Sequence, residues 1–173
     1  MTPTVPPGTP AADPLFPAGV PTDDAKRSLV LEQYKQMLQT IESLEARRQT
    51  LHTFFMSINT LLLAAIGLIA KESLNQPGVT VGIMLLAVLG VEFSSCWLAQ
   101  IRSYEAVLKS KWTVFNDLER AMPSRPFGEE YALLDSGFVS FTKIECRVPK
   151  AFRLAYALVV LVGVLLTAGL DII

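Results

Sequence analysis

Three long apolar runs, separated by polar segments, set the pattern of the chain. They are residues 54–70, 79–101 and 151–173, and only the second carries a charge near its middle, Glu92. About 20 helical residues cross the apolar core of a bilayer, with a range of roughly 17 to 25. The pattern predicts an all-α integral membrane protein with three transmembrane helices.

Basic residues are distributed unevenly around these runs. Five Lys or Arg precede the first run, one (Lys71) lies between the first and second, and eight lie in residues 102–150. The positive-inside rule places the sides with more Lys and Arg in the cytoplasm. We therefore expect a membrane protein with a cytoplasmic N-terminus, cytoplasmic residues 102–150 and a C-terminus outside.

The N-terminal polar region divides in two. Residues 1–21 hold seven of the eleven prolines and no Lys or Arg, which is typical of a disordered tail and unlike a signal peptide. Thr22 and Asp23 then offer capping groups for an amphipathic helix over residues 22–53.

That helix carries an apolar stripe at alternating spacings of four and three, which Arg48 interrupts. The spacing is that of a short heptad seam, so the stripe packs either on the rest of its own chain or on other subunits. The candidate oligomer-interface residues are Val30, Tyr34, Met37, Ile41 and Leu44.

The connections between the apolar runs give further boundaries. Pro77 and Gly78 favour a turn between the first two spans. Beyond residue 101 the apolar spacing stays helical, so the second helix should continue unbroken into the cytoplasm until Pro123 and Pro126 stop it. A short helix around residues 129–134 should follow, and Pro149 should open the third span.

Polar residues inside the spans are the first candidates for function. An ionised Glu92 in hydrocarbon would cost at least about 2.5–3.5 kcal/mol, so the group should be protonated, hydrogen-bonded or in water. The candidate partners for it are Ser57, Asn59, Ser94 and Ser95. Three interpretations stay open. Glu92 forms structural hydrogen bonds within or between subunits, it lies in a water-lined pore or proton site, or the run that contains it is not a transmembrane span.

A charged group at the cytoplasmic boundary is the second candidate. Arg47 and Arg48 precede the first span and suit contacts with lipid head groups. They also suit bidentate pairing with an acid, for which Glu119, Glu129 and Glu145 are candidates. We expect a structural charge clamp rather than a catalytic carboxylate.

Composition excludes several other functions. The chain is 51% hydrophobic and 18% charged with a net charge of −1, which argues against a nucleic-acid surface. His52 is the single histidine, and Cys96 and Cys146 follow no ligand spacing, so we expect no metal and no cofactor. Nucleotide-binding and hydrolase motifs are missing as well, so we expect no enzyme.

Several short motifs together resemble those of a known family. An arginine pair precedes the first span, a Trp precedes an Ile-x-Ser-Tyr segment, a Leu-Glu pair precedes Pro-x-x-Pro-Phe, and a Glu stands three residues before Val-Pro. The residues are Arg47, Arg48, Trp97, Ile101, Ser103, Tyr104, Leu118, Glu119, Pro123, Pro126, Phe127, Glu145, Val148 and Pro149. The chain thereby resembles the RipA-like, octameric membrane protein family. This resemblance implies a ring-like homo-oligomer of eight subunits in the bacterial inner membrane, with no established biochemical activity.

Two functions remain for such a protein. The first is an interaction scaffold whose partners are its own copies, membrane lipids and an unidentified cytoplasmic protein. The alternative is an ion or proton channel in which Glu92 faces a water-filled path.

Overall fold

The structure is a computed structural model. All of the secondary-structure elements in the residues that it describes are helices. The described residues are 15, 16, 20, 23–73, 76–120, 122, 124–133 and 140–169. The helices are α1 (Asp24–Ser73), α2 (Pro77–Glu119), α3 (Pro126–Ala132), α4 (Phe141–Glu145) and α5 (Arg147–Thr167). Three helical stretches, in α1, in α2 and across α4 and α5, are long and apolar enough to cross a membrane, which confirms the predicted fold class.

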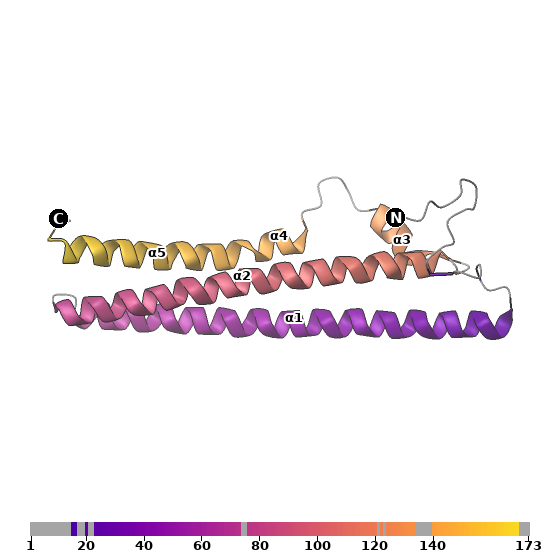
Figure 1. Cartoon of the computed structure of the whole chain (residues 1–173), viewed down its shortest axis with the longest axis horizontal. Helices are drawn as coiled ribbons and strands as arrows, with labels where there is room; N and C mark the ends of the chain where they lie inside the picture. Colours follow the sequence, from indigo (N-terminus) through magenta and orange to yellow (C-terminus); the bar gives the residue numbers. More distant parts are fainter. Residues whose placement is uncertain are drawn as a thin grey trace, which may run out of the picture. The chain divides into compact units, whose positions relative to one another are not determined.

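The first two helices are longer than their apolar runs (Figure 1). In α1, the amphipathic segment and the first apolar run form one helix of 50 residues. The second apolar run continues as predicted, since α2 reaches Glu119 without a break.

The predicted turn at Pro77 and Gly78 is wrong. The helix α1 continues through Ser73, and Pro77 is already the first residue of α2. Proline fits the first position of a helix because its missing N–H would have no partner there and its φ is already helical. The connection between the spans is therefore shorter than the run of polar residues.

Other boundaries shift by a few residues for similar reasons. The short helix after the proline pair begins at Pro126 rather than at residue 129, again with proline in its first turn. The last helix begins at Arg147, so Pro149 lies within its first turn. Residues 170–173 of the predicted third span lie outside the described residues, as does the predicted disordered tail apart from Leu15, Phe16 and Val20.

The chain forms two compact units. One, here called the extension unit, comprises Met1–Glu42 and Leu108–Ser136; the other, the spanning unit, comprises Ser43–Val107 and Gly137–Ile173. Both α1 and α2 contribute residues to each unit.

Aromatic side chains form the core of the extension unit. The ring of Tyr34 stacks on that of Phe115 with centroids 4.5 Å apart, and Trp112 and Phe127 meet Phe115 edge-on at 5.2 and 5.4 Å. Phe115 is completely buried. Aromatic pairs of this geometry add about 0.5–1.5 kcal/mol beyond the burial of their area.

The predicted heptad stripe faces its own chain. Ile41 is 1% exposed and Val30 is 8% exposed in the single chain. Tyr34, Met37 and Leu44 are half-buried. Contacts within the chain already cover much of these interface candidates, which favours the first of the two alternatives for the stripe.

In the spanning unit, α1, α2 and α5 lie side by side (Figure 1) and share two apolar clusters. Ile66, Ile83, Ala87 and Tyr156 form one cluster, from all three helices. Phe55, Trp97 and Ile101 form the other, nearer the polar segments.

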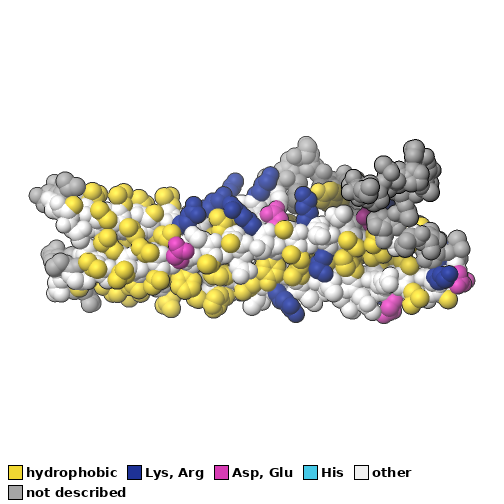
Figure 2. All heavy atoms as spheres, viewed as in Figure 1, with side chains coloured by type: hydrophobic (Ala, Val, Ile, Leu, Met, Phe, Trp, Pro, Cys, Tyr) yellow, Lys and Arg dark blue, Asp and Glu magenta, His cyan; other side chains and the backbone are white. Residues whose placement is uncertain are grey.

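The outside of the spanning unit is as apolar as its inside. Figure 2 shows hydrophobic side chains over the surface of α5, where Leu154, Leu158 and Leu161 are more than half exposed. A soluble protein would not leave so large an apolar surface in water, whereas a membrane protein presents it to lipid or to other subunits.

Candidate functional site

Asn59 lies at the centre of a hydrogen-bonded network that joins the three spanning helices. Its side chain is completely buried; its Oδ1 accepts a bond of 2.9 Å from Ser94 Oγ, and its Nδ2 donates to the Phe55 carbonyl oxygen at 2.8 Å. The Tyr156 hydroxyl donates to the Asn59 carbonyl oxygen at 2.8 Å. Hydrogen bonds between helices are one of the forces that hold spans together in lipid.

A glycine on α2, Gly90, makes room for Tyr156. A Cβ atom at Gly90 would lie 2.5 Å from the Tyr156 ring, so only glycine lets α2 approach α5 at this point. The ring is completely buried and tied to Asn59, so it has little freedom to move aside. The sequence reasoning missed both residues; a tyrosine inside an apolar run was the available signal, because a buried hydroxyl needs a partner.

Glu92 takes no part in this network. Its side chain is exposed on the surface of α2, and no hydrogen bond or ion pair joins it to any other described residue. Ser95, another proposed partner, donates instead to the Val91 carbonyl oxygen at 2.7 Å. The predicted intramembrane polar residues thus divide: Asn59 and Ser94 bind each other, and Glu92 points away from the chain that carries it.

Arg48 and Glu145 form an ion pair where α1 meets α4. Arg48 Nη2 contacts Glu145 Oε2 and also donates to Thr142 Oγ1 at 3.0 Å. The side chains of Arg48 and Glu145 are 16% and 28% exposed. The arginine interrupts the apolar stripe of α1 because at this turn the helix faces polar groups of α4.

Two other residues of the predicted clamp lie elsewhere. Arg47 is exposed on α1. Glu119 is 1% exposed, and its two oxygens accept bonds of 3.0 and 2.9 Å from the backbone N–H groups of Phe127 and Gly128. Glu119 therefore holds the first turn of α3, where Arg125, the preceding residue, offers no side-chain cap.

Glu119 also acts on Tyr34. Burial, and then the charge and hydrogen bonding of Glu119, raise the pKa of Tyr34 above its usual value of 10.0. No local pattern in the sequence predicts this contact, because the two residues are 85 positions apart.

Three buried nitrogen atoms near the Arg48 ion pair have no hydrogen-bond partner in the described part of the chain: Arg48 Nε, His52 Nδ1 and Trp97 Nε1. The His52 and Trp97 rings meet edge-on with centroids 5.0 Å apart. Basic side chains also gather at the start of α5, shortly after Glu145 in the sequence (Figure 2). They are Arg147, Lys150 and Arg153, and all three are exposed. This arrangement fits a membrane boundary, where cations meet lipid head groups.

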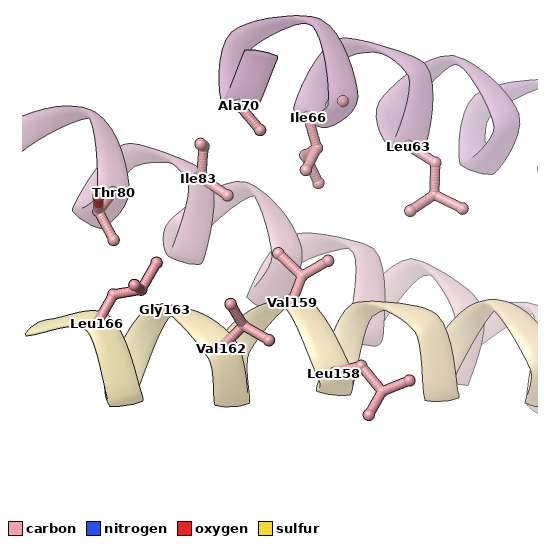
Figure 3. Close-up of a pocket in the computed structure, with 11 residues that line it drawn as sticks. Leu63, Ile66, Ala70, Thr80, Ile83, Leu158, Val159, Val162, Gly163 and Leu166 are labelled. Carbon is pink, nitrogen blue, oxygen red and sulfur yellow. The ribbon is translucent and has the colours of Figure 1, made fainter. Parts of the chain in front are cut away.

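An apolar crevice lies between the far ends of the spanning helices (Figure 3). Its volume is about 400 Å³, and apart from the Thr80 hydroxyl its lining side chains are apolar. Such a lining suits a hydrocarbon chain and offers no group for acid–base or nucleophilic chemistry. Among the described residues, no three His, Cys, Asp or Glu side chains gather in a way that could hold a metal ion.

Among comparisons with known proteins, a family model matches most of the chain. Neither the curated proteins nor the solved structures include a match. The family model of the octameric membrane protein family (8xMP) matches residues 31–166, which is most of the chain and contains the Asn59 network, Glu92 and the Arg48 ion pair. With its three apolar helices, this chain is an oligomeric membrane protein and belongs to the octameric membrane protein family.

Proposed function

We propose that the protein is a homo-oligomeric scaffold of the bacterial inner membrane that presents its extension units in the cytoplasm. The continuity of α1 and α2 carries this proposal. Each helix leaves the apolar region without a break and enters the aromatic core of the extension unit. Several copies in one oligomer would offer several identical docking faces to a partner, which raises avidity without any new contact.

The polar groups support a structural task. Asn59 and Ser94 satisfy each other, Arg48 pairs with Glu145, and Glu119 binds backbone amides. Each of these groups is used to hold helices together, and the family membership supplies the self-association.

A channel is the second candidate, and Glu92 favours it. A carboxyl group that faces away from its own chain in the middle of a span would suit a water-filled path between subunits.

Ion flux through proteoliposomes separates the two functions. We expect vesicles that contain the purified oligomer to hold K⁺ and proton gradients as long as empty vesicles do, at membrane potentials of either sign. Ion flux through the wild-type protein whose selectivity changes in Glu92→Gln would overturn the scaffold and establish the channel. A scaffold also requires the purified protein to remain oligomeric, which mass photometry in mild detergent measures.

A further inference from the structure

The position of Glu92 poses a problem that a single chain does not solve. Glu92 lies ten residues before Arg102 on α2, or about 15 Å along the helix, which is half of a bilayer core of about 30 Å. At that depth a charged side chain that faced lipid would cost at least about 2.5–3.5 kcal/mol. Because the chain belongs to an octameric family, another copy is available to cover it.

Glu92 belongs to an exposed row of otherwise small residues on α2. Residues three and four apart share a face of a helix, and the row opposite the buried Ser94 and Ile101 follows these spacings. We call it the α2 outer stripe; its members are Glu92, Cys96, Ala99 and Ser103, and all four are exposed.

A second row of small residues runs along the exposed face of α1. It repeats at spacings of four and three, as the first row does, and it carries three hydroxyl groups. We call it the α1 outer stripe; its members are Thr53, Ser57, Thr60, Ala64 and Gly67, and all five are exposed. Small residues let membrane helices approach closely, and hydroxyls can both donate and accept hydrogen bonds.

The two stripes match in depth. The bond between Asn59 and Ser94 fixes which levels of α1 and α2 correspond. Counting from that pair in opposite directions brings Cys96 level with Ser57, and brings Glu92 within one residue, about 1.5 Å, of Thr60. In a ring whose axis follows the membrane normal, every subunit keeps the same depths, so these levels also correspond between neighbours.

We propose that the α2 outer stripe of each subunit packs against the α1 outer stripe of the next, with the Glu92 carboxyl group hydrogen-bonded to the Thr60 hydroxyl of the neighbour. The contact is head-to-tail, and it closes into a ring when the rotation between neighbouring subunits divides a full turn. It also removes the carboxyl group from lipid. This inference rests on the proposed oligomer and names the surfaces that build it.

Disulfide cross-linking in native membranes tests the contact. Ser57→Cys, made in a Cys146→Ser background that keeps Cys96, should give intermolecular disulfides on oxidation with copper phenanthroline. Because each subunit would link to two neighbours, the non-reducing gel should show a ladder from dimer to the complete ring.

Two matched variants in the same background control for depth and for face. Ala64→Cys lies on the α1 outer stripe two turns from the level of Cys96, and Leu154→Cys is 63% exposed on α5. We expect neither to form the ladder. Glu92→Gln, which can still bond to Thr60, should keep the ladder of Ser57→Cys, whereas Glu92→Leu should weaken it several-fold.

Other outcomes would overturn the contact in distinct ways. An oligomer that persists while Ser57→Cys gives no cross-link would sink the proposed surface and leave the scaffold standing. Dimers formed by Cys96 alone would mean that the α2 stripes face one another, as around a lumen. A monomer in mild detergent and in membranes would remove both the contact and the scaffold.

Discussion

Polar side chains within the spans act according to the helix face that carries them. Asn59 and Ser94 face the interior of the spanning unit and satisfy each other, whereas Glu92, two residues from Ser94, faces outward. A separation of two residues turns a side chain to nearly the opposite side of a helix. The type of a polar residue therefore says that it needs a partner, and its face says whether the partner is in its own chain.

Gly90 offers a test of the contact beneath the Asn59 network. In Gly90→Ala the new methyl group would overlap the Tyr156 ring and displace its hydroxyl from Asn59, so we expect a loss of about 1–3 kcal/mol in the free energy of unfolding. Unfolding by steric trapping in bicelles measures it. Gly82→Ala is the matched control, since nothing lies within 4 Å of its added Cβ. Equal stability of the two variants would contradict the close approach of α2 and α5.

Tyr34 predicts a dependence on alkaline pH. Its pKa is raised in the folded chain by burial and by Glu119, so the folded protein holds this proton more tightly than the unfolded protein does. The resulting stabilisation is complete below pH 10, the usual pKa, and is lost as the pH rises through the raised pKa.

The matching experiment compares thermal unfolding between about pH 9 and 11. Wild type should lose stability more steeply than Tyr34→Phe, in which the titrating hydroxyl is absent. Tyr131→Phe, at a side chain that is 75% exposed, should behave as wild type. Parallel curves for wild type and Tyr34→Phe would show that the pKa of Tyr34 is not raised in the folded protein.

At the scale of elements, apolar periodicity predicted the helices and missed their ends. The three spans and the continuation of α2 followed from runs and spacings that depend on neighbours in sequence. At Pro77 the sequence favours a turn although α2 begins there, because proline fits both a turn and the first position of a helix.

Contacts between distant elements were partly within reach of sequence reasoning. Arg48 and Glu145 were candidates for one another because both lie next to a span, and the structure brings them together. Glu119 fits the same predicted clamp by its charge, but it binds the start of α3 eight residues later. The difference depends on how the chain turns after α2, which charge and spacing alone do not specify.

The Arg48 ion pair should fasten α4 to α1. In Arg48→Ala the half-buried Glu145 loses its charged partner and Thr142 loses a donor, so we expect unfolding to become easier by about 1–3 kcal/mol. Arg47→Ala changes an exposed arginine one position away and should stay within about 0.5 kcal/mol of wild type. Steric trapping and the rate of proteolysis near residues 140–146 measure the difference. Equal effects of the two substitutions would mean that charge at the membrane boundary, rather than the pair, matters.

Glu119 should hold α3 in place. Glu119→Gln removes the charge and one of two acceptors, and hydrogen bonds to charged groups contribute about 1.5–3 kcal/mol. Amide hydrogen exchange at Phe127 and Gly128 should therefore accelerate strongly, while Glu129→Gln, at an exposed position of α3, should leave it unchanged. Unchanged exchange in Glu119→Gln would show that the prolines alone fix the start of α3.

At the scale of the whole molecule, the distribution of Lys and Arg determines the expected orientation. Lys71 is the one basic residue between the first two spans, whereas five precede the first span and eight lie in residues 102–150. The two segments rich in Lys and Arg should both lie in the cytoplasm, and three crossings then leave the two ends of the chain on opposite sides of the membrane.

Tags at the two termini should therefore respond oppositely to protease. The N-terminal tag should be cleaved only in inverted membrane vesicles and the C-terminal tag only in spheroplasts. Cleavage of both tags in the same preparation would require an even number of crossings, so that at least one of the three apolar stretches would not span the membrane as expected.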